Sequence, residues 1–487
     1  MSQTASTIVQ KVWNYAHVMR DDGLSFLDYT EQITYLLFLK LAWEQRGAQV
    51  DCGIKSKYSW EKLKTIPNNA KLAERYQQAL KNLSKESGLL GLIFTKPQSK
   101  INDPAKLRRL IEMIDGEEWS KLDFDVKGEI YEGLLARNAE DVRGGAGQYF
   151  TSRPVIRAIV QVMQPQPTMR IADPACGTGG FLLAAYEYIM REHPNLDSKA
   201  RKFLDEKAIH GTDLVPPVAR LCAMNLYLHG LGGGNKSLVE IGDSLLKKPD
   251  EVDMVLTNPP FGKKSSFTVI SDDGKRDIEK IYYERKDFWA TTSNKQLNFV
   301  QNVYSMLADN GTAAVVVPDN VLFEAGVGEK IRRELLKCCD VHTLLRLPTG
   351  IWYSPGVKAN VLFFDKKPVA KKPWTKELWI YDLRTNQSFT PRERPITDND
   401  LKDFIEVYQA ANRSNRKESE CFKGFNYSEI MKRDKASLDI FWIKDDNSID
   451  TANLPKPDVL VAEIIKDLEE ALGEFNAVEN ELKQSSE

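Results

Sequence analysis

The first part of the chain carries apolar side chains at helical spacing. Residues 33–41, for example, repeat apolar positions every three or four residues, with Lys40 interrupting the stripe. Strand-like runs are rare before the glycine-rich segment 142–147, which is typical of a domain boundary. We therefore predict an all-α N-terminal domain over residues 1–145.

After Gln148, short β-rich runs alternate with helical stretches. The runs lie at residues 169–173, 208–213, 238–241, 253–257, 312–317, 341–346, 360–364 and 378–381. Strands that alternate with helices are typical of an α/β fold with a doubly wound parallel sheet, whose ligands bind at the carboxyl ends of the strands. We predict such a domain over residues 146–370.

The remaining segment, residues 371–487, contains the last of these runs, at 378–381, and is then polar and weakly patterned. Near its end we predict a helix over about 457–484. Apolar residues along this helix step alternately by three and four positions: Val461, Ile464, Leu468, Ala471, Phe475, Val478 and Leu482. Such an a/d seam fits a helix that binds a partner chain. It fits a helix that packs on its own domain about as well.

Composition excludes several classes of protein. The 487 residues include 67 Lys and Arg against 69 Asp and Glu, so the chain is not a generally basic nucleic-acid binder. A DNA partner is still compatible with this charge balance, because a basic channel can lie on one part of the chain or on another subunit.

The 6 cysteines and 5 histidines show no ligand spacing, so we expect no metal site. Without a signal peptide or a long apolar run, we expect a soluble, cytoplasmic protein with no membrane partner.

Residues 169–182 describe a strand that ends in an acid, a glycine-rich turn and the start of a helix. The turn and its flanks supply candidate ligand-binding residues: Asp173, Ala175, Gly177, Thr178, Gly179 and Gly180. Glycines let the backbone approach a ligand, and helix N-terminal amides face it. Leu182 stands where a dinucleotide motif would have its last glycine, so a dinucleotide is disfavoured.

Two acids end the next two strands. Asp213 can accept both hydroxyls of a ribose, and Asp243 can accept from an adenine amino group. Each also fits an ordinary role, Asp213 as a helix cap before Pro216 and Asp243 as a turn residue. The presence of both acids, at successive strand ends after a glycine turn, favours a cofactor that contains a nucleoside.

The fourth strand is followed by Asn258, Pro259, Pro260 and Phe261. The prolines stiffen the turn, so the Asn258 carbonyl and a proline backbone carbonyl can accept from an exocyclic NH2 group. These hydrogen bonds draw the amine lone pair out of ring conjugation, which activates a poor nucleophile. Phe261 can stack on the base, which must leave the duplex to arrive there. If the cofactor is a sulfonium methyl donor, it is already reactive. Catalysis then depends on the positioning of the amine and on charge stabilisation, and no titrating general base is required before attack. A plain strand-ending turn is the alternative.

Together these motifs resemble S-adenosylmethionine-dependent amino-methyltransferases, in the motif order of DNA adenine-N6 methyltransferases. With residues 128–132, 147–153 and 224–230, nearly the whole chain is similar to the modification subunits of type I restriction-modification systems. The resemblance implies a Rossmann-like methyltransferase sheet between the helical domain and a C-terminal helical tail. It also implies transfer of a methyl group from S-adenosylmethionine to the N6 of a flipped adenine in double-stranded DNA.

The resemblance assigns roles by position. The segment over the methionine end of the cofactor would be Gln148, Tyr149, Phe150, Thr151, Ser152 and Arg153. Thr178, Gly179 and Gly180 would line its carboxylate and ribose side, Asp213 would hold the ribose hydroxyls, and Asp243 would approach the adenine of the cofactor. Residues 258–261 would grip the target base. The family usually has proline where Ser152 stands and often glutamate where Asp213 stands.

Sequence recognition is expected to lie in another chain. A target-reading domain needs roughly 100 residues or more, and the part after Phe364 is short and lacks a recognition motif. The resemblance implies a specificity subunit flanked by two modification subunits, which a restriction and motor subunit can join. The alternatives are a methyltransferase for cytosine N4, RNA or a protein glutamine amide, and an inactive assembly scaffold.

Overall fold

The computed structural model describes residues 14, 26–44, 54–119, 151–232, 236–261, 266–270, 276–352, 357–390 and 394–444. The chain divides into one compact unit that ends at Ile440 and a second unit over Phe441–Glu487. The predicted helix at 457–484 lies outside the described residues, as do Gln148, Tyr149 and Phe150.

The N-terminal part is helical wherever the structure describes it, as predicted. Its helices are α2 (Phe26–Glu44), α3 (Trp60–Lys64), α4 (Asn69–Leu83), α5 (Gly88–Ile93) and α6 (Pro104–Asp115), with a 3-10 turn, η1 (Ser56–Tyr58). The side chains of Asn68 and Asp103 cap α4 and α6 by accepting backbone N–H groups. Lys40 is buried on the apolar face of α2, where its ammonium lies 2.9 Å from an Asp115 carboxylate oxygen.

A nine-stranded sheet follows, in the order β11-β10-β8-β9-β7-β4-β1-β2-β3. Its strands are β1 (Ile171–Asp173), β2 (Ile209–Asp213), β3 (Val239–Ile241), β4 (Val252–Thr257), β7 (Leu307–Pro318), β8 (Cys339–Arg346), β9 (Ala359–Lys366), β10 (Glu377–Asp382) and β11 (Phe422–Asn426). The strands from β3 through β2, β1 and β4 to β7 pair in parallel, whereas β9 runs antiparallel to β7 and β8. All eight predicted runs are strands of this sheet.

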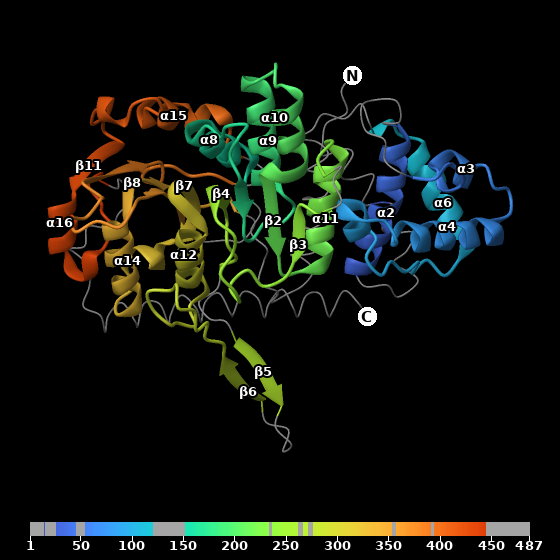
Figure 1. Cartoon of the computed structure of the whole chain (residues 1–487), viewed down its shortest axis with the longest axis horizontal. Coiled ribbons are helices and arrows are strands. Elements are labelled where there is room, and N and C mark those ends of the chain that lie inside the picture. The colour runs from blue at the N-terminus through green and yellow to red at the C-terminus, as the bar shows by residue number, and fades with distance from the viewer. Residues whose placement is uncertain are drawn as a thin grey trace, which may run out of the picture. The chain divides into compact units, whose positions relative to one another are not determined.

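The sheet extends further than the sequence pattern indicated. Strands β10 and β11 lie beyond residue 370, where we expected the sheet domain to end, and β10 pairs in parallel with β8. A separate antiparallel hairpin, β5 (Ser266–Ile270) and β6 (Arg276–Lys280), projects below the sheet in Figure 1. Neither β11 nor this hairpin was predicted.

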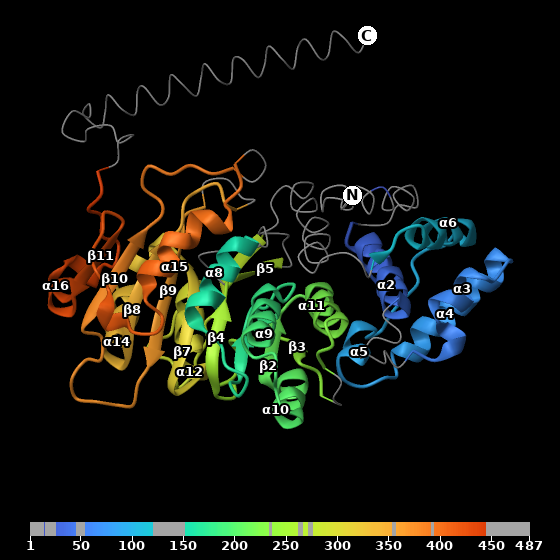
Figure 2. The ribbon, with the colours of Figure 1, turned by 90° about the horizontal axis from the view of Figure 1, so that it is seen from above.

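Helices cover both faces of the sheet, which is therefore doubly wound as predicted (Figures 1 and 2). Helices α8 (Arg153–Met163), α9 (Gly180–Glu192) and α15 (Lys402–Tyr408) pack on one face, and α12 (Lys295–Met306) and α14 (Val327–Cys338) on the other. The remaining helices are α10 (Ser198–Phe203), α11 (Pro216–Leu228), α13 (Asp319–Phe323), α16 (Tyr427–Lys432) and the short turns η3 (Leu204–Ala208), η4 (Asp398–Leu401), η5 (Arg413–Asn415) and η6 (Asp434–Ala436). Among the described helices, none is both long and apolar enough to cross a bilayer.

Candidate active site

The strand order reverses beside β1, with β2 and β3 on one side and β4 and β7 on the other. Ligands of doubly wound sheets bind at this reversal, outside the carboxyl ends of the strands. Asp173 ends β1, Asp213 ends β2 and Thr257 ends β4, directly before Asn258. The structure thus brings Asp173, Asp213 and Asn258 to one edge of the sheet.

The glycine turn between β1 and α9 has a backbone conformation that is strained for residues other than glycine. Gly177 and Gly179 have φ angles of 54° and 87°, in the left-handed region that favours glycine. A Cβ atom at Gly179 would lie 2.9 Å from Sγ of Cys222, on α11, whereas one at Gly177 would meet nothing within 4 Å. The turn is therefore packed on its α11 side and open at Gly177.

Asp173 is buried beneath this turn, and its Oδ1 accepts two hydrogen bonds. The Thr257 hydroxyl donates at 2.6 Å and the Ala175 backbone N–H at 3.0 Å. Burial is the largest influence and raises the pKa of Asp173 to about 7; the charge of Asp213 adds to it, and the two hydrogen bonds oppose it. Near neutral pH this carboxyl group therefore exists in both protonation states.

The other two acids already serve the local fold. Asp213 accepts backbone N–H groups of Gly177 at 3.0 Å and Val215 at 2.8 Å, one on each carboxylate oxygen, and burial raises its pKa. Asp243 accepts the Leu245 N–H at 2.9 Å and the Tyr283 hydroxyl at 2.8 Å. Asp243 therefore has the turn role foreseen for it, whereas Asp213 is not the helix cap, because Val215 is the N-cap residue of α11 and no side chain caps this helix. Each oxygen can accept a second hydrogen bond, so these contacts leave room for a ligand.

The Asn258–Phe261 turn is held from two directions. The Asn258 amide Nδ2 donates to the Thr151 hydroxyl at 2.8 Å, so Thr151 fixes the direction in which the amide points. The Phe261 ring packs edge-on against Trp352, with ring centroids 5.9 Å apart and planes 66° apart. Of the two prolines between Asn258 and Phe261, Pro259 is buried and Pro260 is exposed.

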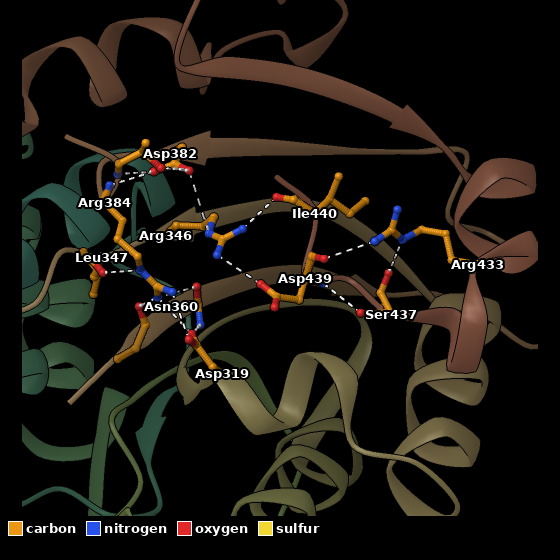
Figure 3. Close-up of polar contacts among 12 residues, drawn as sticks. Asp319, Arg346, Leu347, Asn360, Asp382, Arg384, Arg433, Ser437, Asp439 and Ile440 are labelled. Carbon is orange, nitrogen blue, oxygen red and sulfur yellow. Dashed lines mark hydrogen bonds and ion pairs between the residues drawn. The ribbon is translucent and has the colours of Figure 1, made fainter. Parts of the chain in front are cut away.

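Trp352 lies in the connection from β8 to β9, and Arg384 braces the base of that connection. The Arg384 guanidinium donates to the backbone carbonyls of Leu347 and Ala359, both at 3.1 Å. It also pairs with both carboxylate oxygens of Asp319 at 2.9 Å, as Figure 3 shows. Burial alone would raise the pKa of Asp319, but the hydrogen bonds and charge of Arg384 lower it.

Several residues of this site were missed by the sequence analysis. Thr257, Tyr283, Trp352 and Arg384 contact predicted residues or their supports, but each is distant in sequence from its partner. Only Thr257 had a signal, because it directly precedes Asn258 at a strand end. Of the predicted segment over the cofactor, Thr151, Ser152 and Arg153 lie at the start of α8, with Arg153 buried. No group of His, Cys, Asp and Glu that could hold a metal ion occurs in the described part of the chain.

A doubly wound sheet with a glycine turn after its first strand and Asn-Pro-Pro-Phe after β4 defines the class of amino-methyltransferases. The model of the family N-6 DNA Methylase matches residues 122–440, and that of the HsdM N-terminal domain matches residues 8–114. The chain therefore belongs to the N-6 DNA methylases.

Full-length relatives narrow the assignment. The chain is 36% identical to the type I restriction enzyme StySPI methylase subunit of Salmonella potsdam, over 99% of this chain and 96% of the relative. It is 35% identical to the EcoKI methylase subunit of Escherichia coli K12, with the same 99% and 96% coverage.

Solved structures agree with this assignment. The crystal structure of the EcoKI M protein is 32% identical with a TM-score of 0.55, covering 98% of this chain and 96% of that one. A modification subunit of a type I restriction enzyme from Vibrio vulnificus YJ016 is 25% identical with a TM-score of 0.71, covering 93% and 100%. The chain is a methylase subunit of the type I restriction-enzyme class, and thus an adenine-N6 DNA methyltransferase. The cytosine, RNA, protein and scaffold alternatives are not supported.

Proposed function

We propose that S-adenosylmethionine is the methyl donor and binds at the carboxyl ends of β1, β2 and β3. When bound, it supplies an electrophilic methyl group on a sulfonium centre. The open space at Gly177 and the amides at the start of α9 suit a ligand that lies against the turn. Asp213 and Asp243 would accept from the ribose and the adenine of the cofactor with their remaining acceptor capacity.

The target base would lie against the Asn258–Phe261 turn. The Asn258 side-chain carbonyl and a proline backbone carbonyl would accept from the N6 amino group, and the contact with Thr151 orients the amide for that task. Phe261 would stack on the base with its ring backed by Trp352. The amine becomes positively charged as it is methylated, and the acceptor oxygens stabilise this charge until a proton leaves to water. The observation that carries this proposal is the position of Asn258 at the end of β4, next to the β1 turn.

The substrate and partners follow from the class of the relatives. We infer that the chain acts on double-stranded DNA with a specificity subunit, two copies of this chain flanking one copy of that subunit. A restriction and motor subunit would join when cleavage accompanies modification. The helical tail at 457–484 is the segment we propose for subunit binding.

Co-expression in a host that lacks DNA methylation tests this function. We expect N6-methyladenine in digested DNA when the chain is produced with its specificity subunit, and none when it is produced alone. Asn258→Ala should abolish methylation while calorimetry still detects S-adenosylmethionine binding. Asn399→Ala, a matched change at an exposed asparagine, should leave methylation intact. Full methylation by Asn258→Ala would overturn the assigned mechanism, and N4-methylcytosine would overturn the substrate.

A further inference from the structure

We infer that Arg220, on α11, is a positioning residue through which the N-terminal helices set the affinity of the cofactor site. The ligand in this inference rests on the proposed function. The coupling of the N-terminal helices to the glycine turn is argued only from contacts between α2, α11 and that turn.

Arg220 joins α11 to α2 through a closed polar network. Its Nη1 lies 3.0 Å from the Tyr35 hydroxyl oxygen and 2.5 Å from Oε1 of Glu31. The Tyr35 hydroxyl in turn donates to the same Glu31 oxygen at 3.0 Å. The Arg220 and Glu31 side chains are 17% and 16% exposed, so their charges are poorly screened by water and their pairing is stronger than at an open surface.

Apolar contacts lie beside this network. Phe38, on α2, lies against Tyr227, on α11, with ring centroids 5.7 Å apart. Leu89, on α5, covers Gly232, where an added Cβ atom would lie 2.3 Å from the Leu89 Cδ1 atom. The hydrophobic effect is non-directional, whereas hydrogen bonds are directional. The Arg220 network therefore adds a directional tie between α11 and α2 to these apolar contacts.

The opposite side of α11 contacts the cofactor turn. Cys222 lies under Gly179, and the Asn225 amide donates to the backbone carbonyl of Thr178 at 2.9 Å. Both side chains are buried. One position in a helix is rotated by about 100° from the next, so residues 222 and 225 face away from residue 220.

The start of α11 is tied to the same turn. Asp213 accepts the N–H of Val215, the residue before the helix, and also the N–H of Gly177. Gly177, Thr178 and Gly179 therefore all depend on the position of α11. Because a helix moves as a rigid element, a shift permitted by loss of the Arg220 network would displace the turn. By linkage, cofactor binding would equally strengthen the docking of the N-terminal helices.

Two measurements on the full-length chain test this inference. Arg220→Gln should weaken S-adenosylmethionine binding by about fivefold in calorimetry, at the low end of typical coupling between sites. In the protein without ligand, the same variant should speed hydrogen exchange of the amides at residues 177–183. Tyr35→Phe, which removes only the hydroxyl, should produce both effects to a smaller degree. The charge-swapped double variant, Glu31→Arg with Arg220→Glu, should recover part of the affinity for S-adenosylmethionine that Arg220→Gln loses.

The matched control is Arg333→Gln on α14. Arg333 pairs with Glu329 at a distance of 2.8 Å, and this pair does not contact the glycine turn. It should change neither measurement. Unchanged affinity and unchanged exchange in Arg220→Gln and Tyr35→Phe would overturn the inference, even if the melting temperature falls. If the wild-type chain fails to bind S-adenosylmethionine, the proposed cofactor is wrong, and the exchange measurement still decides the role of Arg220.

Discussion

At the residue scale, Asp173 is the group through which we expect pH to act on cofactor binding. Burial raises the pKa of Asp173 to about 7, so its carboxyl group is negative above this pH and neutral below it. S-adenosylmethionine carries positive charge, which favours the carboxylate form. We therefore predict that its Kd rises as the pH falls through 7, with a slope approaching about tenfold per pH unit below the pKa. Calorimetry at pH 6, 7 and 8 measures this dependence.

Two substitutions distinguish Asp173 from other titrating groups. Asp173→Asn should weaken binding at pH 8 and remove the dependence, because no charge remains to titrate. Thr257→Val removes a hydroxyl whose hydrogen bond lowers the pKa of Asp173, so the midpoint should move to higher pH. A midpoint that stays in place in both variants would assign the pH dependence to another residue.

At the element scale, the eight strands that the sequence predicted share a simple cause. Most are short runs rich in apolar residues that end at polar or turn residues, and this pattern needs no tertiary contact to be recognised. Strand β11 (Phe422–Asn426) is different, because it contains Gly424 and Lys423 and is polar overall. It is a strand because it pairs with β10 at the edge of the sheet, and the sequence does not reveal that pairing.

The same distinction applies to the site. The shared position of Asp173, Asp213 and Asn258 could be predicted because each ends or directly follows its own strand, and the carboxyl ends of parallel strands meet at one edge. The contact of Arg384 with Leu347 depends on β10 lying next to β8, in an order that only the folded sheet gives. Polar partners set by strand order are therefore the part of the site that the sequence could not predict.

The β8–β9 connection gives a prediction at this scale. Arg384→Gln removes the donors that hold Leu347 and Ala359, so the segment with Trp352 should loosen and Phe261 should lose its backing. We expect methyl transfer to DNA by the complex with the specificity subunit to slow by about tenfold. The Kd of S-adenosylmethionine should stay unchanged, because the contacts of Arg384 lie on the β4 side of β1.

Arg433→Gln is the matched control for this prediction. Arg433 donates to the backbone carbonyls of Ser437 and Asp439 in the same region, but not to the β8–β9 connection (Figure 3). Its transfer rate should equal that of the wild type. Equal rates for Arg384→Gln and the wild type would show that the connection keeps its place without the brace.

At the scale of the whole molecule, every described contact of the site lies in the unit that ends at Ile440. Arg346, fully buried at the end of β8, donates to the Ile440 carbonyl at 2.6 Å and so secures the last residue of this unit. We therefore predict that a chain ending at residue 444 binds S-adenosylmethionine and melts like the full chain. It should fail to copurify with the specificity subunit, because it lacks the apolar seam at 461–482.

Point substitutions in the full chain separate the seam from the mere presence of a tail. Leu468→Glu with Phe475→Glu places charges on the seam, so copurification should be lost while cofactor binding stays. Glu470→Gln changes a residue off the seam and should assemble normally. If the seam variant assembles but binds the cofactor weakly, the helix packs on its own chain, and the specificity subunit must bind elsewhere. Normal assembly together with normal cofactor binding would exclude the seam from both roles, and the N-terminal helices would then be the next surface to test.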